Sequence, residues 1–221
     1  MSRAAAAPPV SAAGIALSVI LLGAAGGLIF QGVQLLRYSR ISTAASELLA
    51  EEYWRRPLFP QLAPLREQAG EWRDAPGVRS GARALYFRLG QASGVPAPTL
   101  LAEAADVIRI DPVSGEAWSN FATASLAASR VDLALAAWDV SSVLAPREDR
   151  DMLWRLSFLA GLWSAASEAQ KQRFFFDIQL LSTRGGATRF GNVWPGILRS
   201  LPREVAREIE GGRRALPRPG W

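Results

Sequence analysis

Few residues in this chain have the types and spacing that catalysis requires. Ser167 and Lys171 are four residues apart, so a helix would place them on one face, where a lysine could act as the base for a serine nucleophile. The same spacing is typical of a solvated helix face, which is the interpretation we favour. Glu51 and Glu52 are adjacent, so on a helix they diverge by about 100° and do not converge on one substrate. We therefore expect no catalytic residue.

The composition removes whole classes of active site. The chain of 221 residues contains no histidine and no cysteine. Histidine is the commonest general base and metal ligand, and cysteine supplies disulfides, thiolate nucleophiles and zinc sites. A phosphate-binding glycine loop and a GxSxG nucleophile motif are also absent from the sequence. We expect no enzyme activity, no cofactor and no metal, and a small-molecule ligand is not indicated.

The N-terminal segment has the length and composition of a membrane span. Residues 10–30 contain no charged side chain, and after Arg3 the next charge is Arg37. About 20 apolar residues cross a bilayer as a helix, so we predict a transmembrane helix over 11–37 that follows an N-terminal tail over 1–10. A cleaved signal peptide is the alternative, because LLGAAGG offers small residues after an apolar run. The apolar sequence LIFQGVQLL continues through that point and favours a retained anchor.

Small residues form a stripe within this predicted span. Gly23 and Gly27 are a GxxxG pair. Such a stripe allows a second helix to approach closely in the membrane, where packing drives association. Glycine is also generally frequent in membrane helices, so the alternative is that the pair has no partner.

The charges on the two sides of the span give opposing indications of orientation. Arg3 precedes the span and four arginines lie between residues 37 and 56, which by the positive-inside rule would place the following domain in the cytoplasm. A short basic start before an apolar run is, however, typical of export signals, and long domains translocate largely regardless of charge. We expect a single-pass protein of the cell inner membrane with its soluble domain in the periplasm.

The stretch over residues 112–146 predicts a pair of helices. Pro112 suits a first helical turn, the turn SRVD separates two apolar-periodic segments, and Pro146 ends the second. The large and small residues of this pair have the spacing of a tetratricopeptide repeat (TPR): Trp118, Phe121, Ala122, Ala134, Trp138, Ser141 and Pro146. The chain thus resembles that family here, with one departure at Ser125, where an aromatic residue is usual.

The resemblance implies an array of stacked helix hairpins, because one repeat cannot bury its own apolar face. We expect a TPR-like domain over residues 80–183. In that family the first helices of the repeats line a groove that binds a protein partner. We accordingly predict partner-binding residues at exposed positions on this domain and in the loop that follows it, at Asn120, Arg130, Arg155 and Trp194.

The remaining segments are assigned by composition. Residues 38–79 contain several prolines and predict a juxtamembrane helix followed by a linker with one short helix over 65–73. Residues 184–212 predict a loop and a helix, and 213–221 a basic disordered tail. The segment from 184 to the end carries eight arginines against three glutamates. It lacks the interleaved aromatic residues of a single-strand binder, so we expect contact with membrane lipid or an anionic polysaccharide and no nucleic acid.

Together these features predict an all-α protein with one N-terminal transmembrane helix followed by a TPR-like helical-hairpin solenoid. Membrane-anchored proteins with a similar layout serve in bacterial envelope polysaccharide export, cytochrome maturation and division machinery, and the sequence does not choose among these. The expected function is a non-enzymatic scaffold or adaptor that binds protein partners in the membrane or envelope to assemble or regulate an envelope complex. The alternative is an accessory subunit held in a larger membrane complex mainly by its transmembrane helix.

Overall fold

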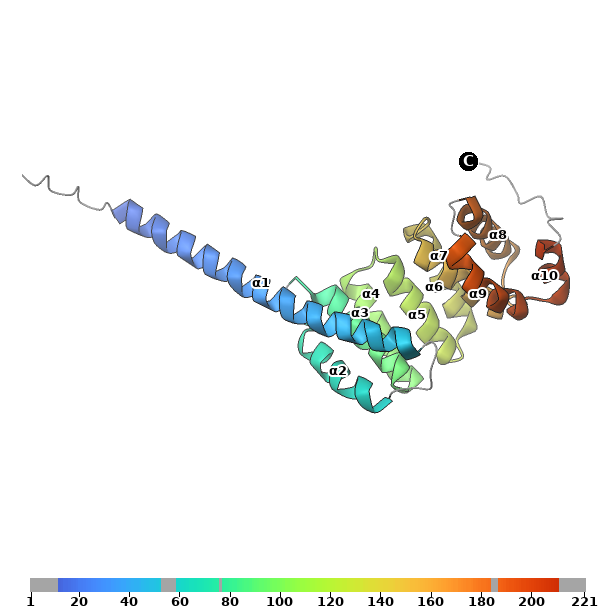
Figure 1. The fold of residues 1–221 in the computed structure, drawn as a ribbon, viewed down its shortest axis with the longest axis horizontal. Helices are drawn as coiled ribbons and strands as arrows, with labels where there is room; N and C mark the ends of the chain where they lie inside the picture. Colours follow the sequence, from blue (N-terminus) through green and yellow to red (C-terminus); the bar gives the residue numbers. More distant parts are fainter. Residues whose placement is uncertain (1–11, 53–58, 76, 184–186, 211–221) are drawn as a thin grey trace, which may run out of the picture.

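A computed structural model describes residues 12–52, 59–75, 77–183 and 187–210, and all regular secondary structure in these ranges is helical. The predicted all-α class is therefore confirmed (Figure 1). The helices are α1 (Ala12–Glu52), α2 (Phe59–Glu71), α3 (Arg79–Ala92), α4 (Ala97–Ile110), α5 (Gly115–Ala127), α6 (Val131–Leu144), α7 (Asp149–Gly161), α8 (Glu168–Thr183), α9 (Ala187–Ser200) and α10 (Arg203–Glu210).

Helix α1 is a single rod of 41 residues, which at 1.5 Å per residue is about 60 Å long. Its N-terminal half projects away from the other helices (Figure 1) and exposes large apolar side chains from Val19 to Leu36. The stretch Val19–Ala45 is long and apolar enough to cross a membrane, with a mean hydropathy of 1.9 over an 18-residue window. Beyond residue 37, where the predicted span ends, the helix continues without interruption to Glu52, through the start of the segment for which the sequence predicts a juxtamembrane helix.

The C-terminal half of α1 packs against α2 and α3. Tyr38 and Ile41 lie against a cluster of buried side chains contributed by all three helices, namely Ala45, Leu62, Ala69, Leu85 and Leu89. Gly81 of α3 permits the close approach, because a Cβ atom at this position would lie 2.8 Å from the Tyr38 hydroxyl oxygen. The exposed apolar segment of α1 is thus continuous with a C-terminal segment that packs on the helical domain.

Helix α2 occupies most of the segment for which the sequence predicts a linker. It begins at Phe59, six residues before the predicted short helix, and includes Pro64 in its interior. Proline removes a backbone donor and usually ends a helix, which is why the sequence favours a linker. Here Leu62 and Ala69 are fully buried against α1 and α3, and this tertiary packing outweighs the local cost.

The helices from α3 to α8 form three consecutive hairpins. Their first helices make a continuous layer, since α5 packs against both α3 and α7. The second helices differ: α4 has no comparable packing against α6 in the part of the chain that the structure describes, whereas α8 meets α6 through Gln170, which donates to the Leu135 carbonyl and to Asp139. We call the solvent side of α3, α5 and α7 the first-helix face. Packing continues past residues 80 and 183, because α2 contacts α3 and α9 contacts α7 and α8.

The central hairpin, α5 with α6, is closely packed. The hydroxyls of Ser119 and Ser141 are 2.9 Å apart across the two helices, both in buried positions. Gly115 begins α5 beside the end of α6, where a Cβ atom would lie 2.5 Å from the Ala145 Cβ. A residue with a side chain does not fit there without movement of the backbone, so glycine sets the spacing of the pair.

The main apolar core lies where α6, α7, α8 and α9 meet. Trp138 is fully buried, and Trp163 packs edge-on against Phe174 and Phe175 with ring centroids 5.2 and 5.9 Å apart. Such edge-to-face pairs are the preferred aromatic geometry. Phe176, the third of the consecutive phenylalanines, is only half-buried, as the 100° step between helical residues requires.

Candidate functional site: a membrane-interface cavity and the first-helix face

The described residues hold no group of three or more histidine, cysteine, aspartate or glutamate side chains placed to bind a metal ion. Ser167 and Lys171 make separate contacts at the start of α8. The Ser167 hydroxyl accepts from the backbone N–H of Gln170 at 3.2 Å, while Gln170 Oε1 accepts from the backbone N–H of Ser167 at 2.9 Å. This reciprocal pair is a capping box. Lys171 Nζ donates to Glu168 Oε1 at 2.8 Å, so both side chains act at the helix terminus.

The four predicted partner-binding residues occupy different environments. Asn120 is half-buried on α5, and Arg130 is exposed at the N-cap of α6. Trp194 does not lie in a loop as predicted: it belongs to α9, is half-buried and packs against the main core. Arg155 was expected to be exposed, and this expectation is wrong, because its side chain is 0% exposed in α7.

Arg155 is the centre of a buried polar network. Its Nε donates to Asp177 Oδ2 at 2.8 Å and its Nη1 donates to the Ala145 carbonyl at 2.9 Å. Arg173 Nε lies 3.5 Å from the other Asp177 oxygen, and Trp138 Nε1 donates to the Arg155 carbonyl at 3.1 Å. The network therefore joins the end of α6 to α7 and α8, and Arg155 serves the structure of the domain.

The sequence does contain a signal for this burial. Arg155 shares a helix face with Met152 and Leu159, which lie three residues before it and four after it, and both are fully buried, as is the adjacent Leu156. An arginine in the middle of an apolar stripe requires a buried partner. That partner, Asp177, is 22 residues away in the next helix, where local spacing does not reveal it.

Asp139 supplies a testable pH dependence. Asp139 is an exposed residue, but partial burial of its carboxyl raises the pKa, and a hydrogen bond from Gln170 Nε2 at 2.8 Å only partly opposes this. Because the folded state holds this proton to a higher pH than the unfolded state, folding takes up a proton. Stability therefore falls as pH rises from the unfolded pKa through the raised one, and increases again on acidification.

We expect Asp139→Asn to remove this part of the pH dependence. Urea unfolding of the full-length protein in a mild detergent, followed by tryptophan fluorescence between pH 4 and 7, measures it. Asp74→Asn is a control of opposite sign, because the hydrogen bond from Arg83 lowers the pKa of Asp74 and this carboxylate loses its stabilising effect as pH falls. Parallel profiles for wild type and Asp139→Asn would contradict the expectation.

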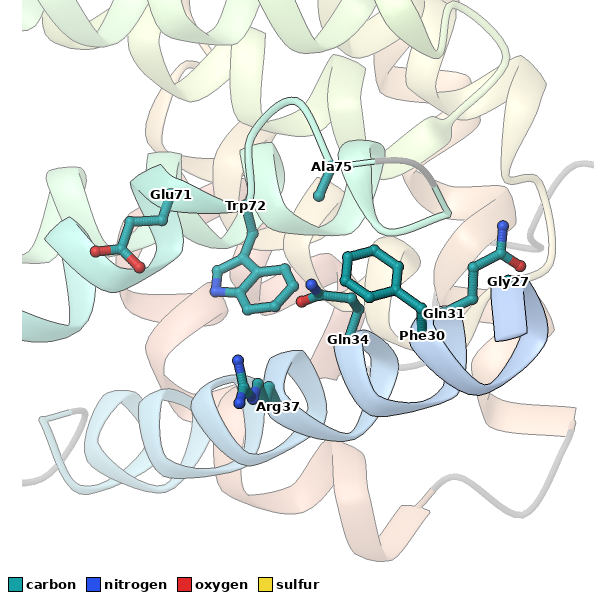
Figure 2. Close-up of a pocket in the computed structure, with 8 residues that line it drawn as sticks. All are labelled: Gly27, Phe30, Gln31, Gln34, Arg37, Glu71, Trp72 and Ala75. Carbon is teal, nitrogen blue, oxygen red and sulfur yellow. The ribbon is translucent and has the colours of Figure 1, made fainter. Parts of the chain in front are cut away.

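A cavity of about 520 Å³ lies between α1 and the turn that joins α2 to α3. Figure 2 shows the indole of Trp72 facing α1 across this space, with Phe30 beside Gln34 on the opposite wall. The lining residues come from one face of α1 and from the turn: Gly27, Phe30, Gln31, Gln34, Arg37, Glu71, Trp72 and Ala75. The cavity lies where the exposed apolar part of α1 gives way to polar residues.

The polar groups of this cavity lack partners among the described residues. Arg37 and Glu71 are both exposed, and neither forms an ion pair in the described part of the chain. Gln34 Oε1 is shielded from solvent and accepts no hydrogen bond from a described residue. A buried acceptor without a donor is costly, so this atom favours a ligand that carries an N–H or O–H group. The sequence showed no signal for the cavity, because α1 and Trp72 meet only through the fold.

Gly23 and Gly27 lie on the projecting part of α1. A Cβ atom at either position would have no neighbour within 4 Å. The small stripe therefore faces away from every described part of the chain, apart from the edge of the cavity at Gly27. It leaves space for a second helix, which is what the alternative function requires.

Comparisons with known proteins found no matching family model, no matching curated protein and no matching solved structure.

Proposed function

We propose that this protein is a non-enzymatic, membrane-anchored adaptor whose TPR-like helix hairpins bind a protein partner at the membrane of the bacterial envelope. One observation carries the proposal: a single continuous helix, α1, combines an exposed apolar segment long enough to span a bilayer with a docked segment on the domain. A domain attached in this way is held close to the bilayer and in a fixed orientation. That suits a scaffold better than a flexibly tethered domain does.

The first-helix face is the proposed partner surface. At one end it is covered by α1, which packs on α3. Arg88 of α3 and Glu116 of α5, 3.8 Å apart, lie next to this covered end. Asn120 follows Glu116 by one helical turn on the same face of α5, and its amide nitrogen is shielded from solvent with no described acceptor. A partner that supplies a hydrogen-bond acceptor would satisfy this group.

The protein is proposed to sit in the inner membrane with the domain on the periplasmic side, and its complex to be one that assembles or regulates the envelope. The export-type N-terminus supports this orientation. Polysaccharide export and cytochrome maturation are the processes in which proteins of similar layout act. The basic tail over 213–221 lies outside the described residues, and its proposed contact is an anionic lipid or polysaccharide surface.

The second candidate function is that of an accessory subunit held by its transmembrane helix. The unoccupied space around Gly23 and Gly27 is the observation that favours it. In this case the partner would be a membrane helix, and the soluble domain would only cap the complex.

Two variants separate these functions when the protein is purified from cross-linked native membranes and its retained partner is quantified. Asn120→Arg is expected to reduce partner recovery about tenfold or more, because a large cation at this half-buried position of the interface is left unpaired. Ala136→Arg, at an exposed position on the second helix α6, is the matched control and should retain the partner. Gly23→Ile with Gly27→Ile should also retain it. Loss of the partner in the glycine variant alone would instead support the subunit function.

A further inference from the structure

The cavity between α1 and the α2–α3 turn lies at the depth of lipid headgroups if α1 spans the membrane, so the inference below rests on the proposed anchoring. The uncharged part of α1 is followed by Gln31, Gln34 and then Arg37. From Gly27 to Arg37 the helix rises about 15 Å, which takes the cavity from the edge of the hydrocarbon through the interfacial layer. Trp72 adds an aromatic side chain at this level, where tryptophan is enriched in membrane proteins.

The charges that line the cavity fit a ligand carrying both signs. Arg37 offers guanidinium donors, and Glu71 offers carboxylate acceptors, with neither group paired in the described part of the chain. Gln34 Oε1 is a shielded acceptor on the α1 wall of the cavity, beside Phe30. Below these groups, toward the projecting end of α1, Phe30 and Gly27 give an apolar wall. A small zwitterion with an apolar extension offers an anion to Arg37, a cation to Glu71 and an apolar surface to Phe30.

We propose that this cavity binds a phosphatidylethanolamine molecule of the surrounding bilayer. Arg37 donates to the phosphate, and Glu71 accepts from the ammonium N–H groups. The part of an acyl chain nearest the headgroup lies along Phe30 and Gly27. Phosphatidylcholine has no N–H to donate to Glu71, and phosphatidylglycerol brings no cation to Glu71, so the lining selects ethanolamine among common headgroups.

The bound lipid is a second attachment of the domain to the membrane, in addition to α1. The lipid bridges α1 and the α2–α3 turn, and its binding therefore stabilises the docked arrangement of these elements. Tyr38, which follows Arg37 on α1, packs closely on Gly81 of α3. The lipid adds a second contact between α1 and the domain on the side that faces the bilayer.

Native mass spectrometry of the full-length protein in mild detergent tests the proposal. The protein is supplied with an equimolar mixture of phosphatidylethanolamine, phosphatidylcholine and phosphatidylglycerol with identical acyl chains. We expect the ethanolamine lipid to be retained about tenfold over the other two, which is the ratio that one charge-assisted hydrogen bond supports. Glu71→Gln should lower its retention to the level of phosphatidylcholine, and Arg37→Gln should lower the retention of all three.

Glu67→Gln is the matched control, because Glu67 is exposed one turn earlier on α2 and does not line the cavity. It should retain the wild-type preference. Both cavity substitutions are at exposed positions, and equal unfolding midpoints would show that the variants are folded. Equal retention of the three lipids by wild type, or an unchanged preference in Glu71→Gln and Arg37→Gln, would overturn the proposal.

Alkaline carbonate extraction of membranes from the same cells distinguishes this failure from failure of the proposed function. A carbonate-resistant protein without lipid preference would overturn the lipid site and leave the anchor intact. Release of the protein by carbonate would overturn both, because the cavity would then not lie at a headgroup layer.

Discussion

Replacing Arg155 with methionine is expected to lower the free energy of unfolding by about 3–5 kcal/mol, the usual cost of removing one partner of a buried ion pair. The reason is the geometry of the network. Asp177, which is 0% exposed, would lose its 2.8 Å hydrogen bond from Arg155 Nε, and the Ala145 carbonyl would lose its donor. Arg173 remains at 3.5 Å from Asp177 but is too distant to replace that contact. Urea unfolding of the full-length protein in mild detergent measures the loss.

A double-mutant cycle separates the pair from its surroundings. Combining Arg155→Met with Asp177→Leu should cost less than the sum of the two single substitutions, because no charge is then left buried without its partner. Arg150→Met, at an exposed position on the same helix, should change stability by no more than about 0.5 kcal/mol. Strict additivity in the cycle would contradict the structural role assigned to Arg155.

Replacing Trp138 with alanine is expected to cost about 3–5 kcal/mol, the range for truncating a large buried aromatic residue. Trp138 is fully buried between α6 and the core formed by α7 and α8, so the side chain leaves a cavity that rigid helices close only in part. The substitution also removes the donor to the Arg155 carbonyl at 3.1 Å. Thermal unfolding monitored by near-ultraviolet circular dichroism measures the effect.

Trp138→Phe divides the two contributions. It keeps most of the apolar volume and loses the indole N–H, so a loss of about 1–3 kcal/mol is expected. Trp118→Ala provides the comparison, since Trp118 is only half-buried and its truncation should cost clearly less. A similar loss at Trp118 and Trp138 would show that the core does not depend on the α6–α7–α8 junction.

The central hairpin and the apolar helix were predictable because their signals are local. The periodicity of residues 112–146 and Pro146, which follows the end of α6, are encoded within one helix pair. The predicted start at Pro112 is wrong, because α5 begins at Gly115 with the Ser114 hydroxyl as its N-cap. The uncharged run of residues 10–30 likewise identifies the N-terminal helix without reference to the rest of the chain. The resemblance to TPR repeats, in contrast, stays a prediction.

Other features depend on contacts between distant segments and were missed for that reason. Pro64 and Pro195 both lie inside helices, where local rules predict a linker and a loop. Packing of α2 against α3, and of α9 against α7, stabilises these two helices despite their prolines. Rules based on local sequence do not include this tertiary packing. The same applies to Arg155, whose partner is in the next helix, and to the cavity, which exists only because Trp72 packs beside α1.

The measurement that tests the central claim most directly is the membrane topology of the full-length protein. A reporter that is active only outside the cytoplasm is fused after Trp221, and activity is assayed in separated membrane and soluble fractions. A retained anchor with an exported domain predicts activity in the membrane fraction. Activity in the soluble fraction would show that the apolar segment is a cleaved signal, and an intact but inactive fusion would place the domain in the cytoplasm. Either result would contradict a periplasmic adaptor held by α1.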